Sequence, residues 1–339
     1  MLFDWFRRKQ KNCLGIDFGS SGVKVVELSR ENERIVLTNY AIAQVKGGSR
    51  LNIGKLNSSD TAEVLQKIMA QAGISSRQAV ISLSVDETFS TIINMPVMRE
   101  DEIAKTIPFE ARKYVPVPIE EVVLDWSVVG EFIEPGPSKN AGDSLGSQGA
   151  GQTPAVQDAE VPAGGAVQGG SKTMQILIVA VPQEVIKKIA QIAKIANLKV
   201  LAIEQEAFSI IRSLVGKDAG TYLIIDLGKE NVDLVIMDKG AIRLTLTFER
   251  NEALDLPVEA AKIITLYEKR YNRKVARAIL TGGGAMDEDW AGILSSKIGI
   301  PADIGNPFAR LASDPKLAGA LKEIGPFMAV ATGGAMREA

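Results

Sequence analysis

The stretch Leu14-Gly15-Ile16-Asp17-Phe18-Gly19 near the start of the chain is echoed by Leu223-Ile224-Ile225-Asp226-Leu227-Gly228 in its second half. The echo stays in register beyond the glycine, since Val23 matches Val232. Each copy predicts a strand, a tight glycine-containing turn and a second strand. A duplicated hairpin of this kind predicts two similar lobes that face each other across a cleft.

Other segments extend the duplication outward from the two hairpins. A third strand is expected in each copy, at 34–42 and at 241–248. Thr281-Gly282-Gly283-Gly284-Ala285-Met286 is echoed by Thr332-Gly333-Gly334-Ala335-Met336. Strand-like runs alternate with helical patterns, which predicts an α/β fold. The helices are expected at 60–72, 183–196, 257–271 and 287–297.

Composition excludes several classes of chemistry. The chain has 339 residues, no histidine and one cysteine, Cys13. Imidazole bases, His-ligated metals and intrachain disulfides are therefore absent. A formal net charge of −2 gives no sign of a nucleic-acid partner. No apolar run reaches the length of a transmembrane helix, so a cytoplasmic location is expected.

The segment 134–173 is rich in Gly, Pro, Ala, Ser and Gln and almost lacks large apolar residues. Such a segment cannot bury enough surface to offset its ordering entropy, which predicts a disordered loop. The apolar runs before and after it, at 122–128 and 174–180, are expected to be neighbouring strands. A tolerated insertion is favoured over a binding tail.

These motifs, in this order, resemble the actin-like ATPase superfamily, which has a two-lobed ribonuclease-H-like fold. The resemblance implies two phosphate loops, a connecting helix at Ile203–Phe208, an adenosine loop at Thr281–Ala285 and a closing helix at Pro326–Arg337. It implies ATP with Mg²⁺ as a cofactor, the metal held through Asp17 and Asp226. Glu206 would orient an attacking water. The nucleotide-binding positions are Asp17, Gly19, Ser20, Ser21, Lys24, Asp226, Gly228, Gly282, Gly283 and Gly284.

Two features depart from active members of that superfamily. The second phosphate loop carries Lys229, Glu230 and Asn231, and Glu230 is expected to repel a γ-phosphate unless it is paired or screened. The stretch from Gly240 to Ala278 is short and has room for one strand and one helix. The second lobe is therefore expected to be reduced, with little chain for an adenine pocket.

A further signature lies between 78 and 129. It includes Asn94-Met95-Pro96-Val97-Met98 and the run Phe109-Glu110-Ala111-Arg112-Lys113-Tyr114-Val115-Pro116-Val117-Pro118. The acidic start at Glu100 predicts a helix over 99–113 that the prolines stop. This signature resembles the inserted subdomain of the PilM family of type IV pilus assembly proteins, which are similar to FtsA. The positions implied for a partner are Pro96, Phe109, Tyr114 and Pro116.

The resemblance covers nearly the whole chain outside 134–173 and implies a domain plan. The first lobe takes 13–85, 181–219 and the closing helix 325–339, the inserted subdomain takes 86–180, and the second lobe takes 220–324. Residues 1–12 form an amphipathic start. Its apolar residues at 2–6 and the basic residues that follow to 11 could rest on an anionic membrane face. A disordered start, or a clamp on the first lobe, is the alternative.

The function implied is that of a scaffold of the pilus machine at the cytoplasmic face of the inner membrane. It would bind the N-terminal cytoplasmic segment of a PilN-like membrane protein, in a groove between the first lobe and the inserted subdomain. Nucleotide binding would be weak or lost. An active ATPase or sugar-kinase-like enzyme is one alternative, and the related scaffold of type II secretion is another. An FtsA-like protein is disfavoured because Arg337-Glu338-Ala339 ends the chain without an amphipathic helix.

Overall fold

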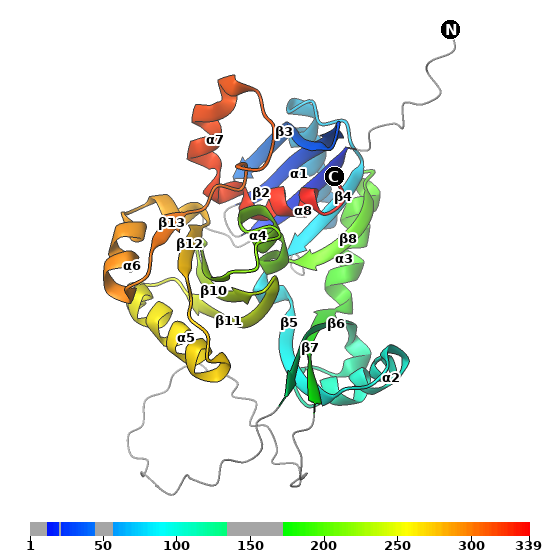
Figure 1. The fold of residues 1–339 in the computed structure, drawn as a ribbon. Coiled ribbons are helices and arrows are strands. Elements are labelled where there is room, and N and C mark those ends of the chain that lie inside the picture. Colours follow the sequence, from blue (N-terminus) through cyan, green and yellow to red (C-terminus); the bar gives the residue numbers. More distant parts are fainter. Residues whose placement is uncertain (1–11, 20–21, 45–56, 134–171) are drawn as a thin grey trace, which may run out of the picture. The chain divides into compact units, whose positions relative to one another are not determined.

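The computed structural model describes residues 12–19, 22–44, 57–133 and 172–339 (Figure 1). The positions Ser20 and Ser21, the segment 2–11 and most of 134–173 lie outside the described residues. The chain divides into a smaller unit, Phe89–Val181, and a larger unit built from the segments before and after it. Within the described residues, no helix is long and apolar enough to cross a bilayer.

Two five-stranded sheets of the same topology form the larger unit. The first, in the order β3-β2-β1-β4-β8, contains β1 (Cys13–Gly19), β2 (Gly22–Glu31), β3 (Arg34–Gln44), β4 (Gln78–Leu83) and β8 (Lys199–Gln205). The second, in the order β11-β10-β9-β12-β13, contains β9 (Thr221–Leu227), β10 (Asn231–Asp238), β11 (Ala241–Glu249), β12 (Arg277–Thr281) and β13 (Ala302–Ile304). In each sheet, three antiparallel strands are extended by two parallel ones. The duplication predicted from the two hairpins is confirmed.

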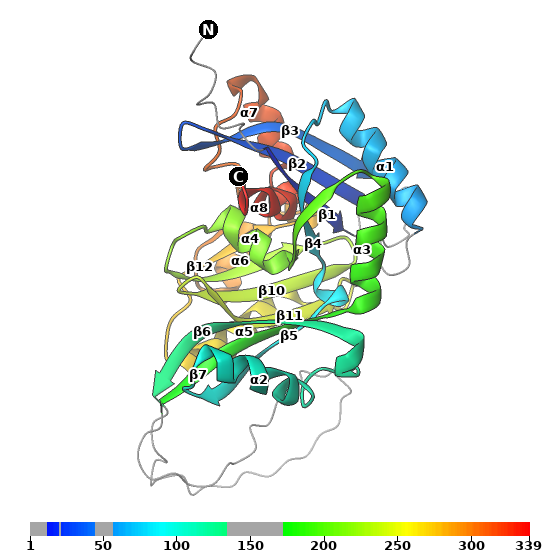
Figure 2. The ribbon, with the colours of Figure 1, turned by 90° about the vertical axis from the view of Figure 1, so that its right-hand side faces the viewer.

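Local capping sets where the helices begin. The larger unit contains α1 (Ser58–Gln71), α3 (Gln183–Ile195), α4 (Glu206–Leu214), α5 (Leu256–Tyr271), α6 (Trp290–Ile298), α7 (Ala318–Ile324) and α8 (Ala329–Met336). The helix expected from 60 starts two residues earlier, because the side chain of Asn57 accepts hydrogen bonds from the first turn. The helix expected from 287 starts three residues later, because Asp289 is its N-cap and accepts from the Gly292 N–H at 3.1 Å. Helices α1 and α3 pack against each other (Figure 2).

Alternating side chains of β9 bury both faces of the second sheet. Leu223, Ile225 and Leu227 pack in one cluster with apolar residues of α5 and α6. Ile224 points to the other face and packs with Ile210 of α4. Between β11 and β12 the chain forms one helix, α5, so the expected reduction of this lobe is observed.

Helices α4 and α8 pack against each other and join the two lobes. Helix α4 packs its apolar residues on the second sheet, in a cluster that also takes in Val330 of α8. Helix α8 in turn lies against β1, β2 and β4 of the first sheet. The two lobes therefore meet along this pair of helices.

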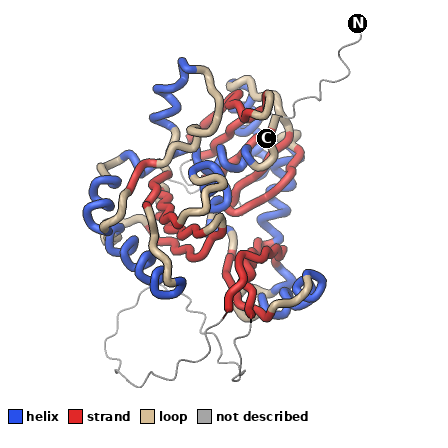
Figure 3. The backbone as a smooth tube through the Cα atoms, in the orientation of Figure 1, coloured by secondary structure: helices blue, strands red, loops and turns tan. Residues whose placement is uncertain are grey.

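The smaller unit is a three-stranded sheet covered by one helix (Figure 3). Its elements are β5 (Phe89–Pro96), α2 (Glu100–Ala111), β6 (Val122–Ile133) and β7 (Lys172–Pro182), with β7 central. Helix α2 packs Ile103, Ile107 and Ala111 on the inner face of the sheet. The expected pairing of β6 with β7 is confirmed.

Two predicted boundaries in this unit are wrong. Strand β7 begins at Lys172, so the segment predicted as disordered over 134–173 extends two residues too far. Helix α2 ends at Ala111 and not at 113, with the Tyr114 N–H bonded to the Ala111 carbonyl at 3.0 Å in a tight turn. Val115 precedes Pro116, a position that disfavours helical backbone, so the chain leaves the helix early.

Candidate functional site

The first hairpin places a buried ion pair at the end of β1. Asp17 on β1 stands opposite Lys24 on β2 in the strand register. The Lys24 Nζ lies 2.7 Å from Asp17 Oδ2, and both side chains are buried. The lysine expected to bind phosphate therefore already has a carboxylate partner from its own hairpin.

The second hairpin repeats the register but not the charges. Asp226 on β9 stands opposite Asp233 on β10, at the position that corresponds to Lys24 in the first copy. Asp233 accepts a hydrogen bond from Thr247 Oγ1 at 2.5 Å. Two carboxylates face the cavity where the first hairpin has a carboxylate and an ammonium.

A fourth carboxylate, Glu206, is the first residue of α4. The connecting helix expected at Ile203–Phe208 is partly wrong, because 203–205 complete strand β8. Glu206 Oε1 accepts from the Val85 N–H at 2.9 Å. Burial, followed by the charges of Asp233, Asp226 and Asp17, raises its pKa well above the ordinary value.

The adenosine loop follows β12 and is held against the segment that precedes α8. Gly282 has φ +85°, and a Cβ there would lie 2.2 Å from Asp226 Oδ1, so only glycine fits. Its N–H donates to the Pro326 carbonyl at 3.0 Å, and Thr281 Oγ1 donates to the same oxygen at 2.8 Å. These bonds bring residue 327 to the cavity.

The cavity between these elements has a volume of about 70 Å³. Its lining includes the predicted residues Asp17, Gly19, Lys24, Glu206, Asp226, Gly228, Gly282 and Gly283. Gly284 does not line it: this glycine is buried against Arg250, whose Nη1 would lie 2.2 Å from a Cβ at position 284. The two repeats thus bring most of the described positions together.

Sequence reasoning missed three kinds of lining residue. Asp233 could have been found, because it occupies the repeat position of Lys24. Asp86 comes from the 3-10 helix Val85–Glu87 before β5, and the amide of Asn231 donates to its carboxylate across the cavity. Phe327 also lines the cavity; it lies in the segment Pro326–Arg337 predicted as the closing helix, but was not predicted as a site residue.

The repulsion of a γ-phosphate expected from Glu230 stays a prediction. Among the described residues, neither Lys229 nor Glu230 lines the cavity. The backbone N–H of Arg250 instead bonds the Glu230 carbonyl at 2.5 Å. The Arg250 guanidinium donates to the Gly228 carbonyl at 3.1 Å and pairs with Asp287 at 2.9 Å. The acidic side chains that do line the cavity are those of Asp17, Asp86, Glu206, Asp226 and Asp233.

The described residues do not fit a bound nucleotide in this arrangement. Pockets for small molecules usually measure about 300–1,000 Å³, well above the cavity observed. The Lys24 ammonium is already paired. Within the part of the chain that the structure describes, no group of three acidic or cysteine side chains is placed to hold a metal ion.

The raised pKa of Asp226 predicts that the protein becomes less stable as the pH rises. Burial, opposed by Lys24 and reinforced by Asp17, raises its pKa from 3.8 to about 6. The folded protein then holds a proton that the unfolded chain releases, so the free energy of unfolding should fall as pH rises between these two values. Asp226→Asn should be more stable than the wild type above this range, by on the order of 1–3 kcal/mol.

Urea unfolding at about pH 5 and about pH 8 measures this effect, with Asp303→Asn on exposed β13 as the control. The stability gained by Asp226→Asn should be larger at the higher pH. Equal gains at both pH values would contradict the burial argument.

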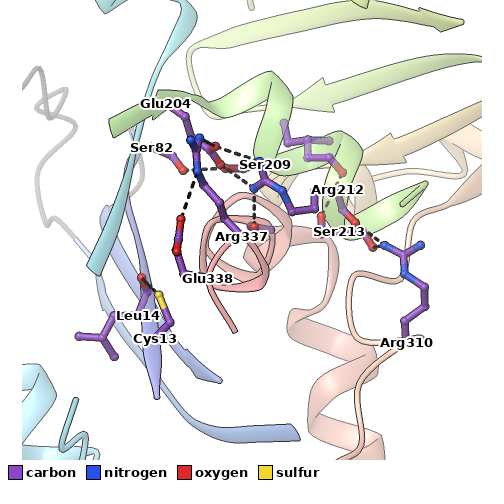
Figure 4. Close-up of polar contacts among 12 residues, drawn as sticks. Cys13, Leu14, Ser82, Glu204, Ser209, Arg212, Ser213, Arg310, Arg337 and Glu338 are labelled. Atoms are coloured by element: carbon purple, nitrogen blue, oxygen red, sulfur yellow. Dashed lines mark hydrogen bonds and ion pairs between the residues drawn. The ribbon is translucent and has the colours of Figure 1, made fainter. Parts of the chain in front are cut away.

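Outside the cavity, Glu204 ties α4 to α8 (Figure 4). Its carboxylate binds Arg212 at 2.7 and 2.9 Å, Arg337 at 2.6 Å and Ser209 Oγ at 2.5 Å. Burial alone would raise the pKa of Glu204, but these hydrogen bonds and charges lower it. Arg212 also donates to the Gly333 carbonyl at 2.6 Å, which fixes α8 on α4.

Two copies of one five-stranded sheet, joined by a packed helix pair with both hairpin turns at one cavity, define the class: this is an actin-like fold. Residues 15–141 match the model of the family described as type IV pilus assembly protein PilM. This match, which covers less than half of the chain, confirms the resemblance to the PilM family seen in the sequence.

The chain is also similar to solved structures. A chain of a "PilM-PilN type IV pilus biogenesis complex" aligns with a TM-score of 0.74 and 22% identity, over 96% of this chain and 98% of that chain. The ethanolamine utilization protein EutJ from Carboxydothermus hydrogenoformans aligns with a TM-score of 0.48 and 12% identity, over 95% and 88%. The cytoplasmic domain of EpsL, from the type II secretion system of Vibrio cholerae, aligns with a TM-score of 0.48 and 10% identity, over 96% and 95%.

Proposed function

We propose that this chain is a scaffold of the type IV pilus assembly machine that binds a segment of a PilN-like protein. The observation that carries the proposal is the match of residues 15–141 to the PilM family model. The likeness of nearly the whole fold to a chain solved in a PilM-PilN complex supports it. A membrane-bound partner of this kind would hold the chain at the cytoplasmic face of the inner membrane, with residues 2–11 available for peripheral membrane contact.

The proposal includes weak or absent binding of ATP and Mg²⁺. The small cavity and the paired state of Lys24 support this part. Four further carboxylates, from Asp86, Glu206, Asp226 and Asp233, oppose an anionic ligand unless a cation screens them. Negligible ATP hydrolysis follows, and the active-ATPase alternative would require a rearrangement of this cavity.

For the partner we propose a surface on the smaller unit. Phe109 on α2 exposes 66% of its surface, an unusual state for a phenylalanine. Pro96 and Pro116 are also exposed, whereas Tyr114 is half-buried against the core of the unit. Exposed aromatic residues of this kind often supply much of the binding energy at interfaces.

Phe109→Ala should weaken binding of a peptide from the start of the PilN-like partner by about tenfold or more, since hot-spot truncations commonly cost at least ~2 kcal/mol. The melting temperature should hardly change, because the ring is mostly exposed in the free protein. Calorimetric titration of the wild type and the variant measures both the affinity and its loss.

Met286→Ala is the matched control, because Met286 is a similarly exposed apolar residue, at 57%, in the second lobe. Its peptide affinity should equal that of the wild type. Failure of the folded wild type to bind any PilN-type peptide would remove the main support for the proposed function. Equal losses in both variants would remove Phe109 from the binding surface.

A further inference from the structure

Two neighbouring side chains, a carboxylate and an aromatic ring, contact the Lys24 ammonium. Asp17 accepts a hydrogen bond from Nζ at 2.7 Å. On another side the ring of Phe327 lies with its centroid 4.3 Å from Nζ, a cation–π contact. An oxygen anion must come within about 2.9 Å of an ammonium nitrogen to bond it, so an anion approaching from this side meets the ring first.

The ring also reaches the opposite side of the cavity. A Cβ at Gly283 would lie 3.2 Å from Phe327 Cδ2, so the ring is in contact with the adenosine loop. Phe327 thus contacts both the first hairpin and the adenosine loop at the cavity. The cavity that remains, about 70 Å³, is well below the roughly 300–1,000 Å³ of usual small-molecule pockets.

The backbone holds the ring in this place. The carbonyl of the preceding residue, Pro326, accepts two hydrogen bonds from the adenosine loop, at 2.8 and 3.0 Å. Met328 and Ala329, which follow, are buried, and Met328 packs in the core of the first lobe. With its chain fixed on both sides, the ring can move only by changing its own rotamer within a packed site.

We propose that Phe327 is the residue that excludes polyphosphates from this cleft, and that its removal restores a binding site for Mg²⁺-bound polyphosphate on Lys24. This inference rests on the weak or absent nucleotide binding in the proposed function. Removal of the ring leaves space next to the ammonium and next to Gly283 at the same time. The carboxylates of the cavity repel an anion. The positive charge of Mg²⁺ offsets this repulsion, so Mg²⁺-bound polyphosphate can enter.

The test is calorimetric titration of Phe327→Ala with MgATP and, separately, with magnesium tripolyphosphate. Both ligands should bind at least tenfold more tightly than they bind the wild type. Lys24→Gln in the Phe327→Ala background should remove the gain. Phe248→Ala, which truncates a half-buried ring in the core of the second lobe, should leave both affinities at the wild-type level. Phe327→Val is the second variant if the alanine variant is poorly folded.

Equal affinities of the Phe327 variants and the wild type would overturn the inference. A gain for ATP without a gain for tripolyphosphate would overturn it too, because the ring would then act on the nucleoside and not on the phosphates. Tight MgATP binding by the wild type would refute both the exclusion and the loss of nucleotide binding. Titration with the PilN-type peptide is a separate test of the proposed function. Absence of peptide binding would refute the scaffold function, whereas the polyphosphate titrations would still test the role of Phe327.

Discussion

Gly333→Ala is expected to destabilise the protein by about 3 kcal/mol or more, at or beyond the upper end of the usual cost of overpacking. A Cβ at this position would lie 1.8 Å from the Ser209 carbonyl oxygen and 2.4 Å from its carbon. The obstacle is the backbone of α4, which cannot swing aside like a side chain. Either α4 and α8 must separate or the lobes must shift.

Urea unfolding of the variant measures this loss, and Gly319→Ala is the matched control. Gly319 lies in α7, and apart from its chain neighbours and the backbone of its own helix no described atom lies within 4 Å of the position that a Cβ would take there. Alanine should therefore stabilise this helix by up to ~1 kcal/mol through its higher helix propensity. The two substitutions are chemically the same and should have opposite signs. A Gly333→Ala protein as stable as the wild type would show that α4 and α8 are not in close contact.

Glu204→Ala is expected to destabilise the protein by about 3 kcal/mol, the lower end of the cost of breaking a buried ion pair. The Glu204 side chain is only 3% exposed, and its loss leaves two arginines without their carboxylate. The cost stays at the lower end because Arg337 is 43% exposed and can be partly hydrated. Glu204→Gln should have an intermediate effect, since it keeps the shape and part of the hydrogen bonding.

Glu204 contributes to the free energy of unfolding with a dependence on pH that is opposite in sign to that of Asp226. Because the folded pKa of Glu204 lies below its ordinary value of 4.5, its stabilisation is complete above that value and is lost as pH falls through the folded pKa. The stability gap between wild type and Glu204→Ala should therefore narrow in acid. A gap that stays constant down to about pH 2 would contradict the role of the two arginines.

Helix α8 connects these predictions with the proposed function. Its Ala331 carbonyl lies 1.8 Å from where a Cβ of Gly15 would stand, so the helix also touches the first phosphate hairpin through backbone. The segment that leads into it carries Phe327. A change in how α8 packs would therefore move the ring that contacts Lys24, which couples the lobe contact to the cavity.

The architecture followed from local patterns. The repeated hairpins with Asp17 and Asp226 predicted two equivalent sheets, and the short stretch from Gly240 to Ala278 predicted a reduced second lobe. Alternation along strands and glycines at tight turns are properties of neighbouring residues, so a single sequence contains them. The same patterns placed most of the described candidate residues at one cavity.

The state of that cavity was decided by contacts between segments far apart in the chain. Phe327 meets Lys24, Asn231 meets Asp86, and Arg250 takes the space beside Gly284. None of these pairs shares a local pattern, because each forms only when distant parts of the chain pack together. The sequence by itself therefore determined a fold with two phosphate-loop hairpins. Only the tertiary structure decided that the Lys24 ammonium contacts the Asp17 carboxylate and the Phe327 ring.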